Sequence, residues 1–153
     1  IERFSSDYEK RATELTVLFP GVRRALEVLQ AHHVDMGICT NKPQSATLEV
    51  LSYFGLSDTF KTVVGGDQLG GIRKPDARHL NAALDNLGVT PANSIMVGDS
   101  ANDIKVAQNA GVLSVAVTFG YSRIPVPELG ATQTIDHFDQ LENALREINE
   151  NRE

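Results

Sequence analysis

The segment "SIMVGDSANDIKVAQNAG", residues 94–111, joins a predicted strand to a predicted helix. Its apolar run at residues 95–97 indicates a short buried strand, and residues 101–110 follow with a helical pattern. Two carboxylates lie at this junction, Asp99 directly after the strand and Asp103 four residues later. Residues at i and i+4 are neighbours on a helix, so both carboxylates can face one point, and Mg²⁺ prefers oxygen ligands. The segment therefore predicts a strand-to-helix junction that binds a cation.

The alternation of strand and helix continues on both sides of this segment. Further strands are expected over residues 34–40, 60–66 and 113–120, and helices over residues 22–33, 43–55, 76–87 and 138–150. Strands that alternate with helices imply a parallel sheet covered by helices on both faces. We therefore predict an α/β fold, with a three-layer Rossmann-like parallel sheet flanked by helices.

Composition and charge narrow the class of protein. With 153 residues the chain is long enough for one domain with a buried core. Its net charge of -6 argues against nucleic acid or an anionic membrane as a partner, and no apolar run reaches the ~18 residues that span a bilayer. Cys39 is the single cysteine, which excludes an internal disulfide and is compatible with a cytoplasmic protein.

Polar residues gather where the predicted strands end, and ligands of such sheets bind beyond the carboxyl ends of the strands. Thr40 precedes a helix, where it either holds a phosphate with free backbone N–H groups or caps the helix. Lys74 is restricted to extended geometry by the following proline and either points into the site or lies in solvent. Asp67 either shapes a loop near the site or forms a turn. Asp99 and Asp103 favour a metal, because like charges held close require neutralisation, over the alternative of a turn residue and a first-turn helix acid.

Three segments together resemble a known family. The stretches "ICTN" (38–41), "RKPD" (73–76) and "VGDSANDIKVAQNAG" (97–111) resemble motifs two, three and four of the haloacid dehalogenase superfamily of phosphohydrolases. The stretches "FPGV", "CTNKP", "VVGGD" and "TFGY" are similar to those of phosphoglycolate phosphatases within it. The resemblance covers roughly residues 15–148, which is nearly the whole chain.

The resemblance implies a role for each site residue. Thr40 would hydrogen-bond the transferring phosphoryl group of a small phosphorylated metabolite, foremost 2-phosphoglycolate, with Asn41 nearby. Lys74 would neutralise the phosphate and the nucleophile. Asp99 would ligate Mg²⁺, and Asp103 would support the metal through water or bond to Lys74. These roles fit phosphoryl transfer, in which positioning and charge neutralisation supply most of the catalysis.

The family's first motif, an apolar strand that ends in Asp-x-Asp-x-Thr, is absent, and no Asp-x-Asp occurs in the chain. Its first aspartate would be the nucleophile that forms an aspartyl-phosphate, and its strand would lie between those of "SIMVGD" and "VDMGICT". We therefore expect a sheet without its central nucleophile strand, in a chain that is inactive and less stable than a complete protein. The expected organisation is a remnant of a helical cap or linker at 1–18, an incomplete core at 19–148 and a tail at 149–153.

Other functions compete with a phosphatase that lacks its first motif. A non-catalytic phosphate-binding, metal-binding or dimerisation module, as a natural short form, would account for the missing nucleophile. Another small-phosphate phosphatase, a phosphomutase or a pyrophosphatase of the same superfamily is the second alternative. A phosphorylation-receiver domain is excluded because its acids precede the threonine and lysine. Of the histidines, His79 and His137 have no partner at ligand spacing, and Cys39 is expected to be a core residue.

Overall fold

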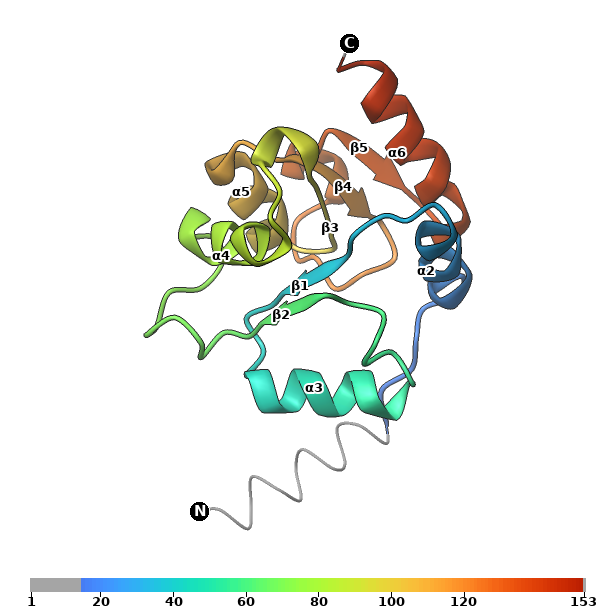
Figure 1. Cartoon of the computed structure of the whole chain (residues 1–153). Coiled ribbons are helices and arrows are strands. Elements are labelled where there is room, and N and C mark those ends of the chain that lie inside the picture. The colour runs from blue at the N-terminus through green and yellow to red at the C-terminus, as the bar shows by residue number, and fades with distance from the viewer. Residues whose placement is uncertain (1–14, 153) are drawn as a thin grey trace.

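The computed structural model describes residues 15–152, and its helices and strands alternate along the chain (Figure 1). The strands are β1 (Gly37–Cys39), β2 (Thr62–Val64), β3 (Ile95–Gly98), β4 (Leu113–Val117) and β5 (Gln133–Ile135). The α-helices are α2 (Val22–Ala31), α3 (Gln44–Tyr53), α4 (Ala77–Leu87), α5 (Ala101–Ala110) and α6 (Leu141–Glu150). Short 3₁₀ helices are η1 (Pro91–Asn93), η2 (Val126–Leu129) and η3 (Phe138–Gln140). The predicted α/β fold is confirmed.

The strands form two separate parallel sheets. β1 pairs with β2, with Ile38 opposite Val63, and β3, β4 and β5 form the second sheet in that order, with Val97 opposite Val115. Within the described residues no strand joins β1 to β3, so the expected sheet without a central strand is confirmed. β5 was not predicted as a strand, because its sequence Gln-Thr-Ile lacks the apolar run that marks the other strands.

Helices cover the sheets in two layers (Figure 1). α4 and α5 pack against each other in one layer, where α4 covers β1 and β2 and α5 covers β3 and β4. α2 and α6 pack together in the other layer, and α6 covers β5. Between α4 and α5 lies a buried apolar cluster, formed by Leu80, Leu84, Val106, Ala107 and Val112. Cys39 of β1 and Met96 of β3 both pack against this cluster, so the α4–α5 layer joins the two sheets.

The two helices of this layer begin and end at residues suited to those positions. The side chain of Asp76 accepts a hydrogen bond from the N–H of Arg78 at the start of α4, and Ser100 caps α5. Gly88 ends α4 and Gly111 ends α5, with φ of 68° and 69°, a region that glycine adopts without steric cost. The predicted glycine stops are confirmed, and α4 begins three residues after Lys74 and α5 two residues after Asp99.

The expected organisation of the chain into a cap remnant, a core and a tail stays a prediction. Residues 1–14 of the expected cap remnant lie outside the described residues. The expected tail at 149–153 overlaps the last turn of α6, and the guanidinium of Arg152 donates to the carbonyl oxygen of Ser94 at 2.8 Å. In the part of the chain that the structure describes, no helix has the length and apolar character needed to span a bilayer.

Candidate active site

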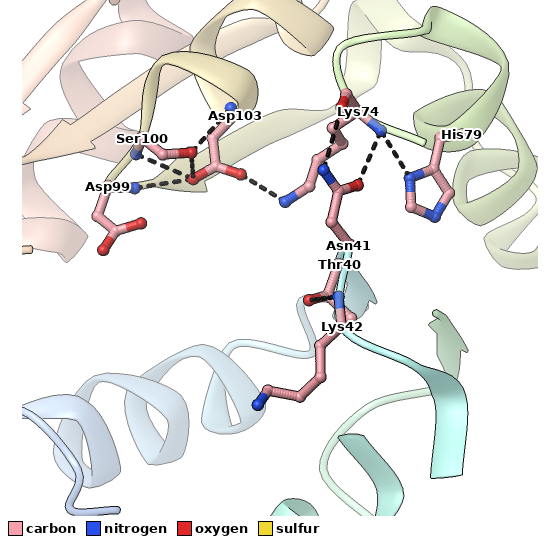
Figure 2. A network of polar contacts seen from close by, with 8 residues as sticks. All are labelled: Thr40, Asn41, Lys42, Lys74, His79, Asp99, Ser100 and Asp103. Carbon is pink, nitrogen blue, oxygen red and sulfur yellow. Dashed lines mark hydrogen bonds and ion pairs between the residues drawn. The ribbon is translucent and has the colours of Figure 1, made fainter. Parts of the chain in front are cut away.

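Asp103 lies in a polar network that connects the start of α5 to the loop before α4 (Figure 2). Its Oδ2 accepts hydrogen bonds from the backbone N–H groups of Asp99 and Ser100, both at 3.0 Å, and from the Ser100 hydroxyl at 2.9 Å. The Ser100 Oγ in turn accepts from the N–H of Asp103 at 3.3 Å, which completes a capping box. The other carboxylate oxygen of Asp103, Oδ1, accepts a hydrogen bond from the ammonium of Lys74 at 2.5 Å. Donors on both sides therefore fix the orientation of the carboxylate.

The ion pair between Lys74 and Asp103 is almost removed from solvent, because the two side chains are only 10% and 8% exposed. Burial by itself would raise the pKa of Asp103, but the charge of Lys74 and the hydrogen bonds from Lys74 and Ser100 outweigh it and lower that pKa. A buried ion pair is tolerated when hydrogen bonds satisfy its remaining lone pairs, as the three donors on Oδ2 do here. The site thus holds a charged carboxylate and a lysine ammonium in fixed positions.

Asp99 follows β3 and lies against the loop after β4. Its Oδ2 accepts from the N–H of Tyr121 at 3.0 Å, and none of the described residues donates to its Oδ1. A Cβ on Gly120 would lie 2.1 Å from the Cβ of Asp99, and one on Gly98 would lie 2.3 Å from the Cβ of Asp103. Glycine is required at both positions, because only a residue without a side chain lets the loop and the strand approach these carboxylates so closely.

The backbone of Lys74 is held by two side chains from other elements (Figure 2). Asn41, after β1, accepts from the Lys74 N–H through Oδ1 at 2.9 Å and donates from Nδ2 to the Lys74 carbonyl oxygen at 3.1 Å. The Lys74 N–H also donates to Nδ1 of His79 at 3.1 Å. Lys74 is followed by a cis peptide bond to Pro75. The loop that carries the lysine is therefore tied both to β1 and to α4.

Thr40 extends the pairing of β1 with β2, because its N–H donates to the carbonyl oxygen of Val64 at 3.1 Å. Its Oγ1 accepts from the N–H of Lys42 at 3.1 Å, and none of the described residues accepts its hydroxyl proton, which can therefore be donated to a ligand. Thr40 does not cap α3. Instead, Oδ1 of Asp67 accepts from the N–H of Gln44 at 2.8 Å, and this bond is the main cause that lowers the pKa of Asp67.

The loop after β2 packs tightly against the loop after β1. The N–H of Gly66 donates to the carbonyl oxygen of Lys42 at 2.8 Å, and a Cβ on Gly66 would lie 2.2 Å from the carbonyl oxygen of Asn41. Oε1 of Gln44 accepts from the N–H of Gly65 at 2.7 Å. The paired glycines of "VVGGD" therefore allow the close contact that positions Thr40 and Asn41.

The described residues provide only part of a metal site. They contain no group of three or more His, Cys, Asp or Glu side chains that could hold a metal ion. Asp99 has one oxygen without a donor from these residues, whereas both oxygens of Asp103 accept hydrogen bonds. Mg²⁺ takes six oxygen ligands in octahedral geometry and commonly keeps several waters. The residues present therefore fit one side of a magnesium site and do not form a complete one.

The structure brings most of the predicted site residues into one network and adds His79 to it. Hydrogen bonds link Asn41 to Lys74, Lys74 to Asp103 and the N–H of Asp99 to Asp103, and Thr40 precedes Asn41 in the chain (Figure 2). For Asp103 the structure has the bond to Lys74, one of the two arrangements that the resemblance implies. His79 was not predicted as a site residue, because it has no partner at ligand spacing; the available signal was its place on the buried face of α4, one turn before Ala83.

Known proteins resemble this chain in sequence and in fold. The model of the haloacid dehalogenase-like hydrolase family matches residues 1–117. The chain is 41% identical over 141 residues to a phosphoglycolate phosphatase of Rhodospirillum rubrum, and 38% identical over 146 residues to one of Agrobacterium fabrum. These matches cover 92% and 95% of this chain but only 58% and 62% of the relatives, so the chain spans about three fifths of their length.

Two solved structures share the fold. A crystal structure named as a predicted phosphoglycolate phosphatase from Haemophilus somnus superposes with a TM-score of 0.88 at 29% identity, over 94% of this chain and 64% of the other. A haloacid dehalogenase-type phosphatase from Thermococcus onnurineus superposes with a TM-score of 0.78 at 27% identity, over 90% of this chain and 64% of the other. The arrangement of strands and helices described above is therefore that of this group of phosphatases.

Proposed function

The chain belongs to the haloacid dehalogenase-like hydrolases, and we propose that the complete protein is a Mg²⁺-dependent phosphomonoester hydrolase of the phosphoglycolate phosphatase type. Its substrate would be a small phosphorylated metabolite, 2-phosphoglycolate, which it would hydrolyse to glycolate and phosphate in the cytoplasm. The identity of 41% and 38% to two phosphoglycolate phosphatases supports this choice of substrate.

The observation that carries the proposal is the fixed ammonium of Lys74. Asp103 holds it through the buried ion pair, and Asn41 and His79 hold its backbone. Phosphoryl transfer needs preorganised positive charge and hydrogen-bond donors around the phosphate more than it needs covalent chemistry from the protein. Lys74 would supply the charge, and the free hydroxyl proton of Thr40 would supply a donor.

Magnesium and the nucleophile require groups beyond those described. When bound, Mg²⁺ would neutralise charge on the phosphate, and Asp99 would supply one of its oxygen ligands through Oδ1. The aspartyl-phosphate would form on a carboxylate outside this chain, since no Asp-x-Asp occurs in it. We therefore expect the isolated chain to be inactive towards 2-phosphoglycolate and to bind Mg²⁺ more weakly than in the micromolar range.

A chimera tests the proposal. The matched part of the Rhodospirillum rubrum relative, 141 aligned residues, is replaced by this chain, and phosphate release from 2-phosphoglycolate is measured with and without Mg²⁺. We expect Mg²⁺-dependent hydrolysis that falls on the order of 100-fold in Lys74→Met and Asp99→Asn, because each removes a preorganised charge. His32→Gln, an exposed change at the end of α2, is the matched control and should keep full activity.

The outcomes separate the two classes of function. Circular dichroism first establishes that each chimera is folded. A folded chimera without activity would refute the phosphatase proposal, as would a chimera whose activity is unaffected by both substitutions. Binding of inorganic phosphate by the isolated chain, together with an inactive folded chimera, would instead support a non-catalytic phosphate-binding module.

A further inference from the structure

His79 is the one fully buried histidine among the described residues, with 0% of its surface exposed. It lies in the first turn of α4, and its ring contacts the loop after β2. Its Nδ1 accepts from the Lys74 N–H at 3.1 Å, and its Nε2 lies 3.2 Å from the carbonyl oxygen of Gly65. Both ring nitrogens are therefore used, one by each of the two loops beside the site.

These partners define one protonation state of the ring. A backbone N–H can only donate, so Nδ1 carries no proton, and Nε2 must carry the proton that it donates to the Gly65 carbonyl. Burial lowers the pKa of His79, and the charges of Lys74 and Arg73 lower it further, against the opposing effect of the Gly65 and Val64 carbonyl groups. The surroundings thus favour a neutral ring that can accept from Lys74.

The hydrogen bond between the Lys74 N–H and His79 holds the backbone of a residue whose side chain forms the buried ion pair with Asp103. The Lys74 ammonium must reach Asp103 across a nearly solvent-free contact, and its direction follows from the position of its own backbone. The N–H of that backbone donates to both Asn41 Oδ1 and His79 Nδ1, and Asn41 Nδ2 donates to its carbonyl oxygen. We propose that His79 is a positioning residue that sets the location of the Lys74 ammonium in the site.

This inference deepens the proposed function and rests on it for the use that Lys74 serves. The competing account gives His79 only a packing role in α4. Packing alone would need the shape of the ring and no acceptor at Nδ1. The two accounts therefore differ in whether the Lys74 ammonium moves when the ring is replaced by an apolar side chain of similar size.

Nuclear magnetic resonance of the isolated chain measures this without substrate or turnover. An ammonium held in a buried ion pair exchanges its protons with water slowly enough to give an observable ¹H–¹⁵N signal, whereas a solvated lysine loses it. We expect the Lys74 ammonium signal in the wild-type chain and in His79→Gln, whose amide offers both an acceptor and a donor. We expect its loss in His79→Leu, and its retention in the matched control Ile148→Val, which alters the buried face of α6 away from the site.

A second measurement needs no variant. The ¹⁵N shifts of the His79 ring should report a proton on Nε2 and none on Nδ1, and the opposite tautomer would overturn the proposal. Persistence of the ammonium signal in His79→Leu would also overturn it, as would loss of the signal in Ile148→Val. In an active chimera His79→Leu should lower kcat/KM on the order of 100-fold, because a displacement of about 1 Å costs that much. An inactive chimera would refute the phosphatase and leave the resonance test of His79 unaffected.

Discussion

Replacing Lys74 with methionine should destabilise the chain by about 3 kcal/mol, because it leaves a buried carboxylate without its counter-ion. The two side chains are 10% and 8% exposed, so solvent screens the pair little. Methionine keeps most of the apolar stem of lysine, which limits the change to the charge. The three donors on Oδ2 of Asp103 remain, so we place the loss at the lower end of the range for broken buried pairs.

The substitution Asp103→Asn should cost more, about 4 to 5 kcal/mol. Its carboxamide has one oxygen and one NH₂ group, whereas Asp103 meets donors on both sides. One side of the asparagine must therefore present a donor to a donor. In the double variant with Lys74→Met the NH₂ group no longer faces an ammonium, so the combined loss should fall short of the sum by about 2 kcal/mol.

Urea titrations followed by circular dichroism at neutral pH measure these free energies of unfolding, with trimethylamine N-oxide added so that the least stable variants start folded. The exposed pair of Arg146 and Glu142 on α6 is the matched control, and its Arg146→Met and Glu142→Gln cycle should show coupling below about 0.5 kcal/mol. Losses for Lys74→Met and Asp103→Asn that add within about 0.5 kcal/mol would refute the reasoning that the ion pair is a coupled, buried unit.

Three further predictions concern pH, a glycine and the cysteine. The folded-state pKa of Asp103 lies below its ordinary value of 3.8. Its contribution to stability is therefore present above pH 3.8 and is lost as the pH falls through the folded pKa. Asp103→Asn should flatten this part of the profile of stability against pH, and an unchanged profile would contradict the reasoning. Gly66→Ala should destabilise the chain by more than about 2 kcal/mol, because the new Cβ would meet a backbone oxygen. Gly88→Ala has open space around its Cβ and should cost only about 1 kcal/mol, because of the positive φ. Urea unfolding of the two variants measures both losses. Burial, modified by nearby charges, raises the pKa of Cys39 to about 11, so at pH 8 its thiol should react with Ellman's reagent far more slowly in the folded chain than in urea, and equal rates would count against the burial.

Much of the fold could be predicted because its signals are local. Residues 101–110 form α5 with the predicted bounds, since a capping residue, an apolar stripe and a terminal glycine all lie within the segment. The strand predicted over 113–120 ends at Val117, because the chain turns there to bring Gly120 against Asp99. That contact depends on β3 and could not be predicted from the strand's own residues.

In the candidate site, too, local signals could be recognised in the sequence, whereas contacts between distant residues could not. Thr40, Lys74, Asp99 and Asp103 became candidates through their types and their positions after strands and before helices, and the resemblance implied their roles. The resemblance left two arrangements for Asp103, and the choice of Lys74 as its partner could not be made from the sequence, since the two residues lie 29 apart in the chain. The same holds for the capping of α3 by Asp67 rather than Thr40.

The sequence by itself determined the order of the helices α2 to α6 and the strands β1 to β4, and it marked the candidate site residues. Periodicity, capping and glycine stops act within a few residues, so they can be recognised without knowing the fold. Only the tertiary structure decided which side chains meet. Asn41 and His79 can hydrogen-bond to the Lys74 backbone because the α4–α5 layer brings the end of β1, the start of α4 and the loop after β2 together. Hydrogen-bond partners depend on distances of a fraction of an ångström between loops, and the packing of the whole core sets those distances.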